Sequence, residues 1–377
     1  MKLLEIAFKN IGIFEKGFSV ELIATDRVLD EDQVFKIYNS IYTQNVLAVT
    51  GSNASGKTSL LKLLRIAIKI VIENAGLNDL DLPDGIIRDG TEMSIIFFNK
   101  GIFYKLVSTI GIKSNIPDKK YYFMEEIVYE KKKSEVKNKE GIKNFEKIAL
   151  IRTQVEKQKD TFLKKQDSII SKFSENQLFY FDTLKTTNLN VYHSRGKDIM
   201  SFVNLFDNSI EFINSNSDEC EIKFKNISLP IVVKTMDTEE FLSSGTIKGS
   251  NVFYAITQIM QTGGYLVIDE IENHIQKKLV QIIIGLFTDK DINKNGATLI
   301  FSTHYAEILD SIDRKDNIYV LRRDKDYVSK VKKYSDFVDR NDIKKSEVLL
   351  SNYIEGTSPN YERINEAKEL LCKLVNM

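Results

Sequence analysis

The sequence predicts an α/β fold with a mostly parallel sheet covered by helices on both faces, N-terminal antiparallel strands and a helical insertion. Three observations lead to this prediction. An apolar run at 46–50 enters a glycine-rich turn at 51–56, which enters an apolar helix. From residue 237 onward, apolar runs alternate with helical patterns of about 10–15 residues, which is typical of a parallel sheet. Residues 2–23 alternate between apolar and polar side chains, which is typical of antiparallel strands.

The glycine-rich turn is the most specific pattern in the chain. It reads Gly-Ser-Asn-Ala-Ser-Gly-Lys-Thr at 51–58, which matches the phosphate-binding loop consensus between a strand and a helix. The two glycines let the backbone approach an anion, and the backbone N–H groups form a phosphate nest at a helix N-terminus. We expect Lys57 to reach the β- and γ-phosphates of ATP, and the Thr58 hydroxyl to bind Mg²⁺. The residues predicted to bind nucleotide here are Gly51, Ser52, Asn53, Ala54, Ser55, Gly56, Lys57, Thr58 and Ser59.

Polar residues at the ends of two later strands complete the predicted site. Asp269 and Glu270 directly follow a four-residue apolar run, and His304 follows the next apolar strand. Because doubly wound sheets bind ligands at the carboxyl ends of their strands, these side chains should meet the phosphate-binding loop. We expect Asp269 to hold Mg²⁺ opposite Thr58, and Glu270 to accept a proton from the attacking water, with Glu272 as the alternative for this role. A lone histidine is usually structural, but at this strand end His304 can sense the γ-phosphate.

The remaining elements follow from periodicity and turn residues. The strands expected are a hairpin or three short strands at 2–23, then 46–49, 91–98, 102–109, 121–129, a pair at 221–233, 265–268, 297–301 and 318–322. The helices expected are 58–74, 200–212, 251–260, 274–287, 305–311, 341–353 and 360–376. The polar stretch 25–40 is expected to be irregular. The helix at 58–74 is so apolar that it must be enclosed on most sides.

One segment differs from the rest in composition. Residues 131–197 are rich in Lys, Glu and Gln and poor in Gly and Pro, and they predict helices at 142–158 and 161–173. Residues 113–165 contain 15 Lys and Arg against 9 Asp and Glu, a net charge of +6. Two interpretations remain open, a solvated helical face or a surface for nucleic acid or a partner protein. The predicted divisions are an N-terminal core lobe at 1–130, a helical basic insertion at 131–197, the rest of the core at 198–340, and C-terminal helices at 341–377.

Composition limits the class of protein. The 377 residues are 42% hydrophobic and 28% charged, with zero net charge, which is ordinary for a globular protein of one or two domains. Cys220 and Cys372 are the only cysteines and have no metal-ligand spacing, which fits a reducing cytosol. We find no signal peptide, and no apolar run approaches the roughly 18 residues of a membrane span. We therefore expect a cytoplasmic protein without a membrane partner.

The order of these motifs resembles that of ATP-binding-cassette (ABC-type) ATPases. A phosphate-binding loop is followed by a long insertion, then Leu-Ser-Ser-Gly-Thr at 242–246, then Asp-Glu, and then His. Residues 242–246 resemble the signature loop of that group. The resemblance implies that Ser243 and Gly245 contact the γ-phosphate held by another subunit. It therefore implies an ATP-dependent head-to-tail homodimer, or a higher oligomer.

Within that group, the chain resembles RecF-, SMC- and OLD-like ATPases. The resemblance rests on the phosphate-binding loop, on Ile-Ala-Phe-Lys-Asn-Ile-Gly-Ile-Phe at 6–14, and on Asp-Glu-Ile-Glu-Asn at 269–273. It is closest for AAA family ATPases of bacterial abortive infection, which are AbiLi-like, RloA-like or belong to PARIS-type systems. Two features depart from the pattern. Ile-Gln-Lys at 275–277 replaces the usual Leu-His-Pro, and no glutamine loop follows the strand at 91–98.

Three functions remain as alternatives. The first is an ATPase that dimerises on ATP and acts as the sensor or scaffold of an antiphage defence system. Its effector is expected to be a separate protein, since the stretch after His304 is too short for the toprim nuclease that such proteins often carry. The second is a DNA-repair or chromosome-maintenance ATPase of the RecF/SMC kind, with residues 113–165 on DNA. The third is the nucleotide-binding subunit of a transporter, which the missing glutamine loop and the long insertion disfavour.

Overall fold

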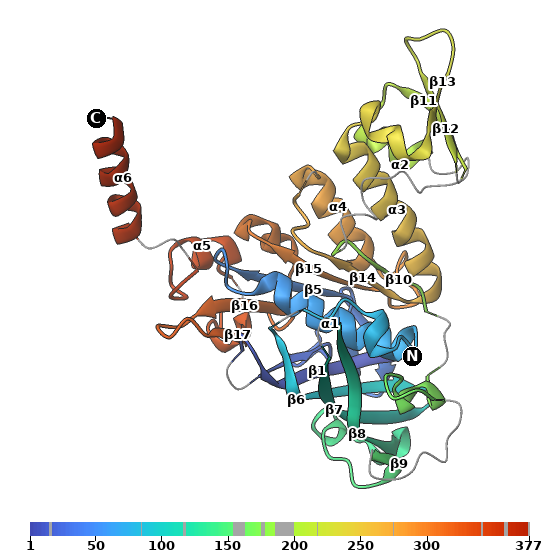
Figure 1. Cartoon of the computed structure of the whole chain (residues 1–377), viewed down its shortest axis with the longest axis vertical. Helices are drawn as coiled ribbons and strands as arrows, with labels where there is room; N and C mark the ends of the chain where they lie inside the picture. The colour runs from blue at the N-terminus through green and yellow to red at the C-terminus, as the bar shows by residue number, and fades with distance from the viewer. Residues whose placement is uncertain are drawn as a thin grey trace.

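Two six-stranded sheets with one helix between them form the centre of the molecule (Figure 1). The structure is a computed structural model. It describes residues 1–14, 17–83, 85–115, 118–153, 163–174, 178–184, 200–216, 218–273, 275–340, 342–357 and 361–375. Within this part, no helix is both long enough and apolar enough to cross a bilayer.

The first sheet is mostly parallel, as predicted. Its strand order is β10 (Tyr180–Asp182), β14 (Tyr265–Ile268), β15 (Thr298–Thr303), β5 (Val46–Gly51), β16 (Ile318–Arg323) and β17 (Ser329–Lys333). The first five strands pair in parallel, and β17 is an antiparallel edge. Along β5, Leu47 and Val49 enter one core, whereas Val46 and Ala48 enter the core on the opposite face. The central strands β14, β15 and β5 are almost entirely buried because both faces of the sheet are covered there.

The second sheet is antiparallel. Its order is β2 (Phe18–Glu21), β1 (Lys2–Ile11), β6 (Ile87–Asn99), β7 (Ile102–Asn115), β8 (Asp118–Lys132) and β9 (Ile148–Thr153). The hairpin at the N-terminus and the three long strands match the predicted alternation. The stretch 25–40, expected to be irregular, contains strand β3 (Val34–Tyr38), which forms a further hairpin with β4 (Ile41–Gln44).

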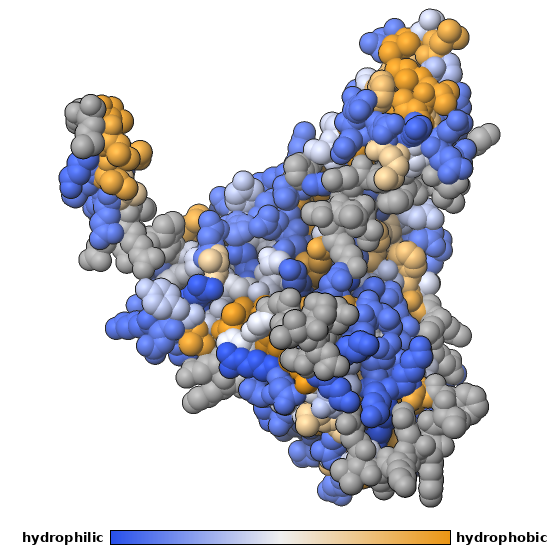
Figure 2. Space-filling view, viewed as in Figure 1, coloured by the Kyte–Doolittle hydropathy of each residue, from blue (hydrophilic) through white to orange (hydrophobic). Residues whose placement is uncertain are grey.

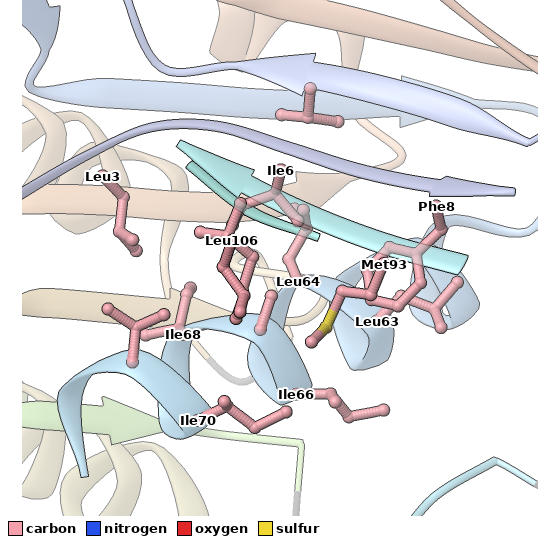
Figure 3. Packing of buried hydrophobic residues seen from close by; sticks show 14 of the residues in the cluster. Leu3, Ile6, Phe8, Leu63, Leu64, Ile66, Ile68, Ile70, Met93 and Leu106 are labelled. Atoms are coloured by element: carbon pink, nitrogen blue, oxygen red, sulfur yellow. The ribbon is translucent and has the colours of Figure 1, made fainter. Parts of the chain in front are cut away.

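Helix α1 (Lys57–Ile72) lies between the two sheets. Twelve of its 16 residues are buried and cover most of its circumference, and the remaining side carries Thr58, Lys62 and Lys69. Leu63 and Leu64 lie against Met93 and Leu106 of the antiparallel sheet (Figure 3). The same cluster includes Val267 and other apolar residues of the parallel sheet. This confirms that the apolar helix is enclosed, and it fixes the position of the loop that precedes it.

Other helices cover the opposite face of the parallel sheet. They are α3 (Ser244–Thr262), α4 (Lys277–Thr288), α5 (Lys345–Leu350) and the 3₁₀ helix η8 (Ala306–Ser311). Phe253, Val280 and Leu309 are buried in this second core. In the part of the chain that the structure describes, the remaining 3₁₀ helices are η1 (Leu77–Asp79), η2 (Lys133–Glu135), η3 (Glu140–Ile142), η4 (Ile169–Lys172), η7 (Thr235–Glu240) and η9 (Tyr334–Asp336).

A small lobe packs on the N-terminal half of α3. It consists of α2 (Met200–Phe206), β11 (Ile210–Ser215), β12 (Glu219–Phe224) and β13 (Ile231–Lys234). The helix predicted at 200–212 is therefore wrong beyond Phe206. Figure 2 shows apolar side chains gathered on this lobe, where Leu229 and Val232 are exposed. The C-terminal helix α6 (Tyr361–Val375) projects away from the sheets (Figure 1).

The helices predicted at 142–158 and 161–173 are wrong for the residues that the structure describes. Ile148–Thr153 form strand β9, which pairs with β8. Residues 163–174 contain only the one-turn helix η4, and residues 154–162 lie outside the described ranges. The Lys- and Glu-rich composition is misleading because it reports exposure to solvent rather than backbone conformation. Pairing with a neighbouring strand decided the conformation instead.

A buried carboxyl connects this segment to the antiparallel sheet. Glu126 of β8 is fully buried, and it accepts hydrogen bonds from Ser168 Oγ (2.6 Å) and the backbone N–H of Ile169 (3.0 Å). Arg152 Nη1 of β9 lies 3.4 Å from the same carboxyl. Burial nevertheless outweighs these contacts and raises the pKa of Glu126 to about 7. The carboxyl is therefore a source of pH-dependent stability.

We expect Glu126→Gln to flatten the pH dependence of stability. The ordinary pKa of the group is 4.5, so between 4.5 and about 7 the folded state binds more protons than the unfolded state. The free energy of unfolding therefore falls as the pH rises through this window, by about 3 kcal/mol for one such carboxyl. Chemical denaturation at about pH 5 and about pH 8 measures the difference. The difference in the free energy of unfolding between the two pH values should shrink in Glu126→Gln and persist in the control Glu125→Gln, an exposed neighbour. Equal differences in wild type and Glu126→Gln would contradict this account.

Candidate nucleotide-binding site

The phosphate-binding loop (residues 51–58) connects β5 to α1 and needs glycine at two positions. Gly51 has φ 148° and Gly56 has φ 103°, both in the region that disfavours residues with a side chain. A Cβ on Gly51 would lie 2.1 Å from the carbonyl oxygen of Leu321 in β16. Gly56 is the N-cap of α1, so the loop ends where the positive end of the helix dipole begins. The loop therefore has the tight shape that the sequence predicted.

Lys57 lies in the centre of the site and is only 6% exposed. Its Nζ donates to the carbonyl oxygens of Gly51 (2.9 Å) and Ser52 (3.1 Å) and lies 3.3 Å from His304 Nδ1. Burial lowers the pKa of Lys57, while the nearby carboxylates of Asp269, Glu270 and Glu272 act in the opposite direction. Since an ammonium group has no acceptor, Nδ1 of His304 must accept this hydrogen bond.

The hydroxyl of Thr58 meets the carboxylate of Asp269, as predicted for two groups that share a metal ion. Thr58 Oγ1 donates to Asp269 Oδ2 at 2.8 Å, although the two residues are 211 positions apart. Among the described residues, no group of three or more His, Cys, Asp or Glu could hold a metal by itself. One carboxylate and one hydroxyl suit Mg²⁺, which keeps several waters and completes its shell with phosphate oxygens. The residues present therefore fit this ion.

Glu270 and His304 form the other side of the constellation. His304 Nε2 lies 3.2 Å from Glu270 Oε1, and with Nδ1 acting as acceptor it is Nε2 that donates. The Glu270 side chain is 45% exposed, so water can reach its carboxylate. Glu272 is bound differently, because its Oε1 accepts from the backbone N–H of His304 at 2.6 Å. Glu270 is therefore better placed than Glu272 to act as a base, and Glu272 holds the backbone of His304.

The structure brings together the phosphate-binding loop with Asp269, Glu270 and His304. Ser243 and Gly245, predicted from the resemblance to a signature loop, lie elsewhere. Ser243 is the exposed N-cap of α3, and its Oγ accepts from the backbone N–H of Thr246 at 3.1 Å. The first turn of α3 lies beside the small lobe formed by α2 and β11–β13 (Figure 1).

Two hydroxyls at the site were missed by the sequence reasoning. Thr183 follows β10, and its Oγ1 accepts from the backbone N–H of Asp269 at 3.1 Å. Ser302 in β15 donates to Asp269 Oδ1 at 2.5 Å. The aromatic run Phe-Tyr-Phe at 179–181 could have indicated the strand β10, but it lies in a segment whose composition favoured helix. The strand beside β14 is β10, whereas the strand predicted at 91–98 is part of β6 in the antiparallel sheet.

Comparison with known proteins agrees with this geometry. A search of curated proteins finds no match. A family model described as "AAA domain, putative AbiEii toxin, Type IV TA system" matches residues 46–310, more than two thirds of the chain. The matched region contains the phosphate-binding loop, Asp269, Glu270 and His304. The chain therefore belongs to this AAA-domain family.

Proposed function

We propose that the protein binds and hydrolyses ATP at the site formed by the phosphate-binding loop, Asp269, Glu270 and His304. The observation that carries this proposal is the convergence of Thr58 and Asp269 at 2.8 Å beside an unbroken line of contacts from Lys57 through His304 to Glu270. These residues come from α1 and from the ends of two strands of the parallel sheet. Ligands of such sheets bind at this edge.

Each side chain has a role that follows from its contacts. Lys57 is held by two loop carbonyls, and it can exchange these neutral partners for phosphate oxygens, which bind an ammonium more strongly. Thr58 and Asp269 would hold Mg²⁺, which when bound offsets the negative charge of the phosphates. Glu270 would accept a proton from the attacking water. His304, which donates to Glu270, orients that carboxylate and lies next to Lys57.

The proposal extends to an ATP-dependent homodimer. The exposed position of Ser243 at the start of α3 supports it, because a helix N-terminus favours a negative charge. The cap that Ser243 and Gly245 would place on a γ-phosphate would come from the partner subunit. A two-fold axis would let each subunit give one cap and receive one.

We further propose that the ATP-driven dimer acts as the sensor or scaffold of an antiphage defence system and controls a separate effector protein. The toxin–antitoxin wording of the family description and the resemblance to abortive-infection ATPases support this role. Three described lysines of the basic segment 113–165, the alternative surface for DNA, are engaged within the protein. Lys131 and Lys139 donate to backbone carbonyls, and Lys143 pairs with Glu21.

Glu270→Gln should bind ATP and Mg²⁺ but hydrolyse ATP about 10²–10⁴ times more slowly, because the amide cannot accept a proton. Glu272→Gln is the matched comparison, since its amide oxygen can still accept from the backbone N–H of His304. It should lose much less activity. Steady-state phosphate release measures the rates, and calorimetry measures binding. Hydrolysis that survives Glu270→Gln and fails in Glu272→Gln would reverse the two roles.

Ser243→Arg should prevent ATP-dependent dimerisation without weakening ATP binding, because it places a bulky cation in the proposed interface and leaves the subunit's own loop unchanged. The measurement is molecular mass by light scattering, with ATP and Mg²⁺, in the Glu270→Gln background. Glu270→Gln alone should form a dimer, and so should the control that adds Ser351→Arg, an exposed serine after α5. A dimer that persists with Ser243→Arg would contradict the proposed interface.

A further inference from the structure

Ser302 binds three consecutive residues that follow β14. Its Oγ donates to Asp269 Oδ1 at 2.5 Å and accepts from the backbone N–H of Glu270 at 2.8 Å. Its carbonyl oxygen accepts from the backbone N–H of Ile271 at 3.0 Å. Ser302 itself is fully buried, whereas Asp269 and Glu270 are partly exposed. A hydroxyl can donate one hydrogen bond and accept others, and the Ser302 hydroxyl does both with residues of the same turn.

The first of these contacts aims the carboxylate of Asp269. Oδ1 is occupied by Ser302, which leaves Oδ2 directed at Thr58 Oγ1. A free carboxylate can rotate and offer either oxygen, whereas one that is bound on one side presents the other in a defined direction. Hydrogen bonds that orient a metal-binding side chain through another of its atoms commonly influence metal affinity.

The other contacts hold the backbone of Glu270. Its φ of 48° lies in the left-handed region, which costs about 1–2 kcal/mol for a residue with a side chain. Such a conformation persists only when neighbouring groups fix it. Ser302 supplies two such bonds, to the N–H groups of Glu270 and Ile271, and Asn273 N–H adds a third by donating to the carbonyl of Glu270 (2.7 Å). In this conformation the Glu270 side chain meets His304.

We propose that Ser302 is a positioning residue that couples the metal-binding carboxylate of Asp269 to the backbone of Glu270. This role rests on the proposed ATPase function. One hydroxyl sets the direction of the oxygen that would bind Mg²⁺ and the conformation of the residue that would accept a proton. Other buried hydroxyls of β15 do not reach these groups, since Thr303 Oγ1 accepts from Tyr305 N–H and Thr298 Oγ1 donates to the carbonyl of Gln44.

Ser302→Ala should weaken the Mg²⁺-dependent part of nucleotide binding. Calorimetry would follow a non-hydrolysable ATP analogue with Mg²⁺ and, separately, with excess EDTA. We expect Ser302→Ala to reduce affinity about 10–100-fold with Mg²⁺ and to leave affinity in EDTA unchanged. Ser302→Cys, which keeps a weak donor of similar size, should give a smaller loss in the same direction. The control Thr298→Val removes a buried hydroxyl from the same strand, away from the site, and should bind like wild type.

Three results would overturn the role of Ser302. Wild type could bind the ATP analogue more tightly with Mg²⁺ than with EDTA, and both Ser302 variants could show the same increase in affinity. Asp269 would then be positioned without Ser302, and the ATPase proposal would stand. Equal losses with Mg²⁺ and with EDTA would likewise show a general structural effect. If wild type binds no nucleotide in either condition, the ATPase proposal itself fails, and the role of Ser302 fails with it.

Discussion

The structure depends on the burial of α1 between two sheets of different kinds. A helix that is apolar around most of its circumference cannot lie on a surface, and here the antiparallel sheet and the parallel sheet cover it from two sides. Its N-terminus is thereby fixed at the edge where β5 and β15 end. Lys57 and Thr58, the first two residues of the helix, consequently reach His304 and Asp269 although more than 200 residues separate them in sequence. The geometry of the site is a result of this packing.

Much of this arrangement could be predicted from the sequence. The glycines at 51 and 56, the apolar run before them and the apolar helix after them each have a local physical cause, and they identify the phosphate-binding loop. Asp269 and His304 could be assigned because parallel strands bring their carboxyl ends to one edge. The contacts of Thr58 with Asp269 and of Lys57 with His304 agree with that reasoning.

Other features could not be predicted, because they depend on contacts between distant segments. Strand β9 lies in a segment whose Lys-, Glu- and Gln-rich composition favours helix, and its conformation is decided by pairing with β8. Strand β10 is three residues long and becomes recognisable through its position beside β14. The hydroxyl of Ser302 resembles any other in an apolar strand until register places it opposite Asp269. Composition and periodicity describe single segments, whereas these features arise where two segments meet.

The central claim is that Lys57 and the loop around it bind the phosphates of ATP. Isothermal titration of the wild-type protein with ATP and Mg²⁺ tests it most directly, beside Lys57→Ala and the control Lys62→Ala, which removes a lysine from the next turn of α1. Wild type and Lys62→Ala should bind one ATP per chain with similar affinity. Lys57→Ala should bind about a hundredfold more weakly or not measurably, because a charged hydrogen bond contributes about 1.5–3 kcal/mol. Unchanged affinity in Lys57→Ala would contradict the assignment of the site.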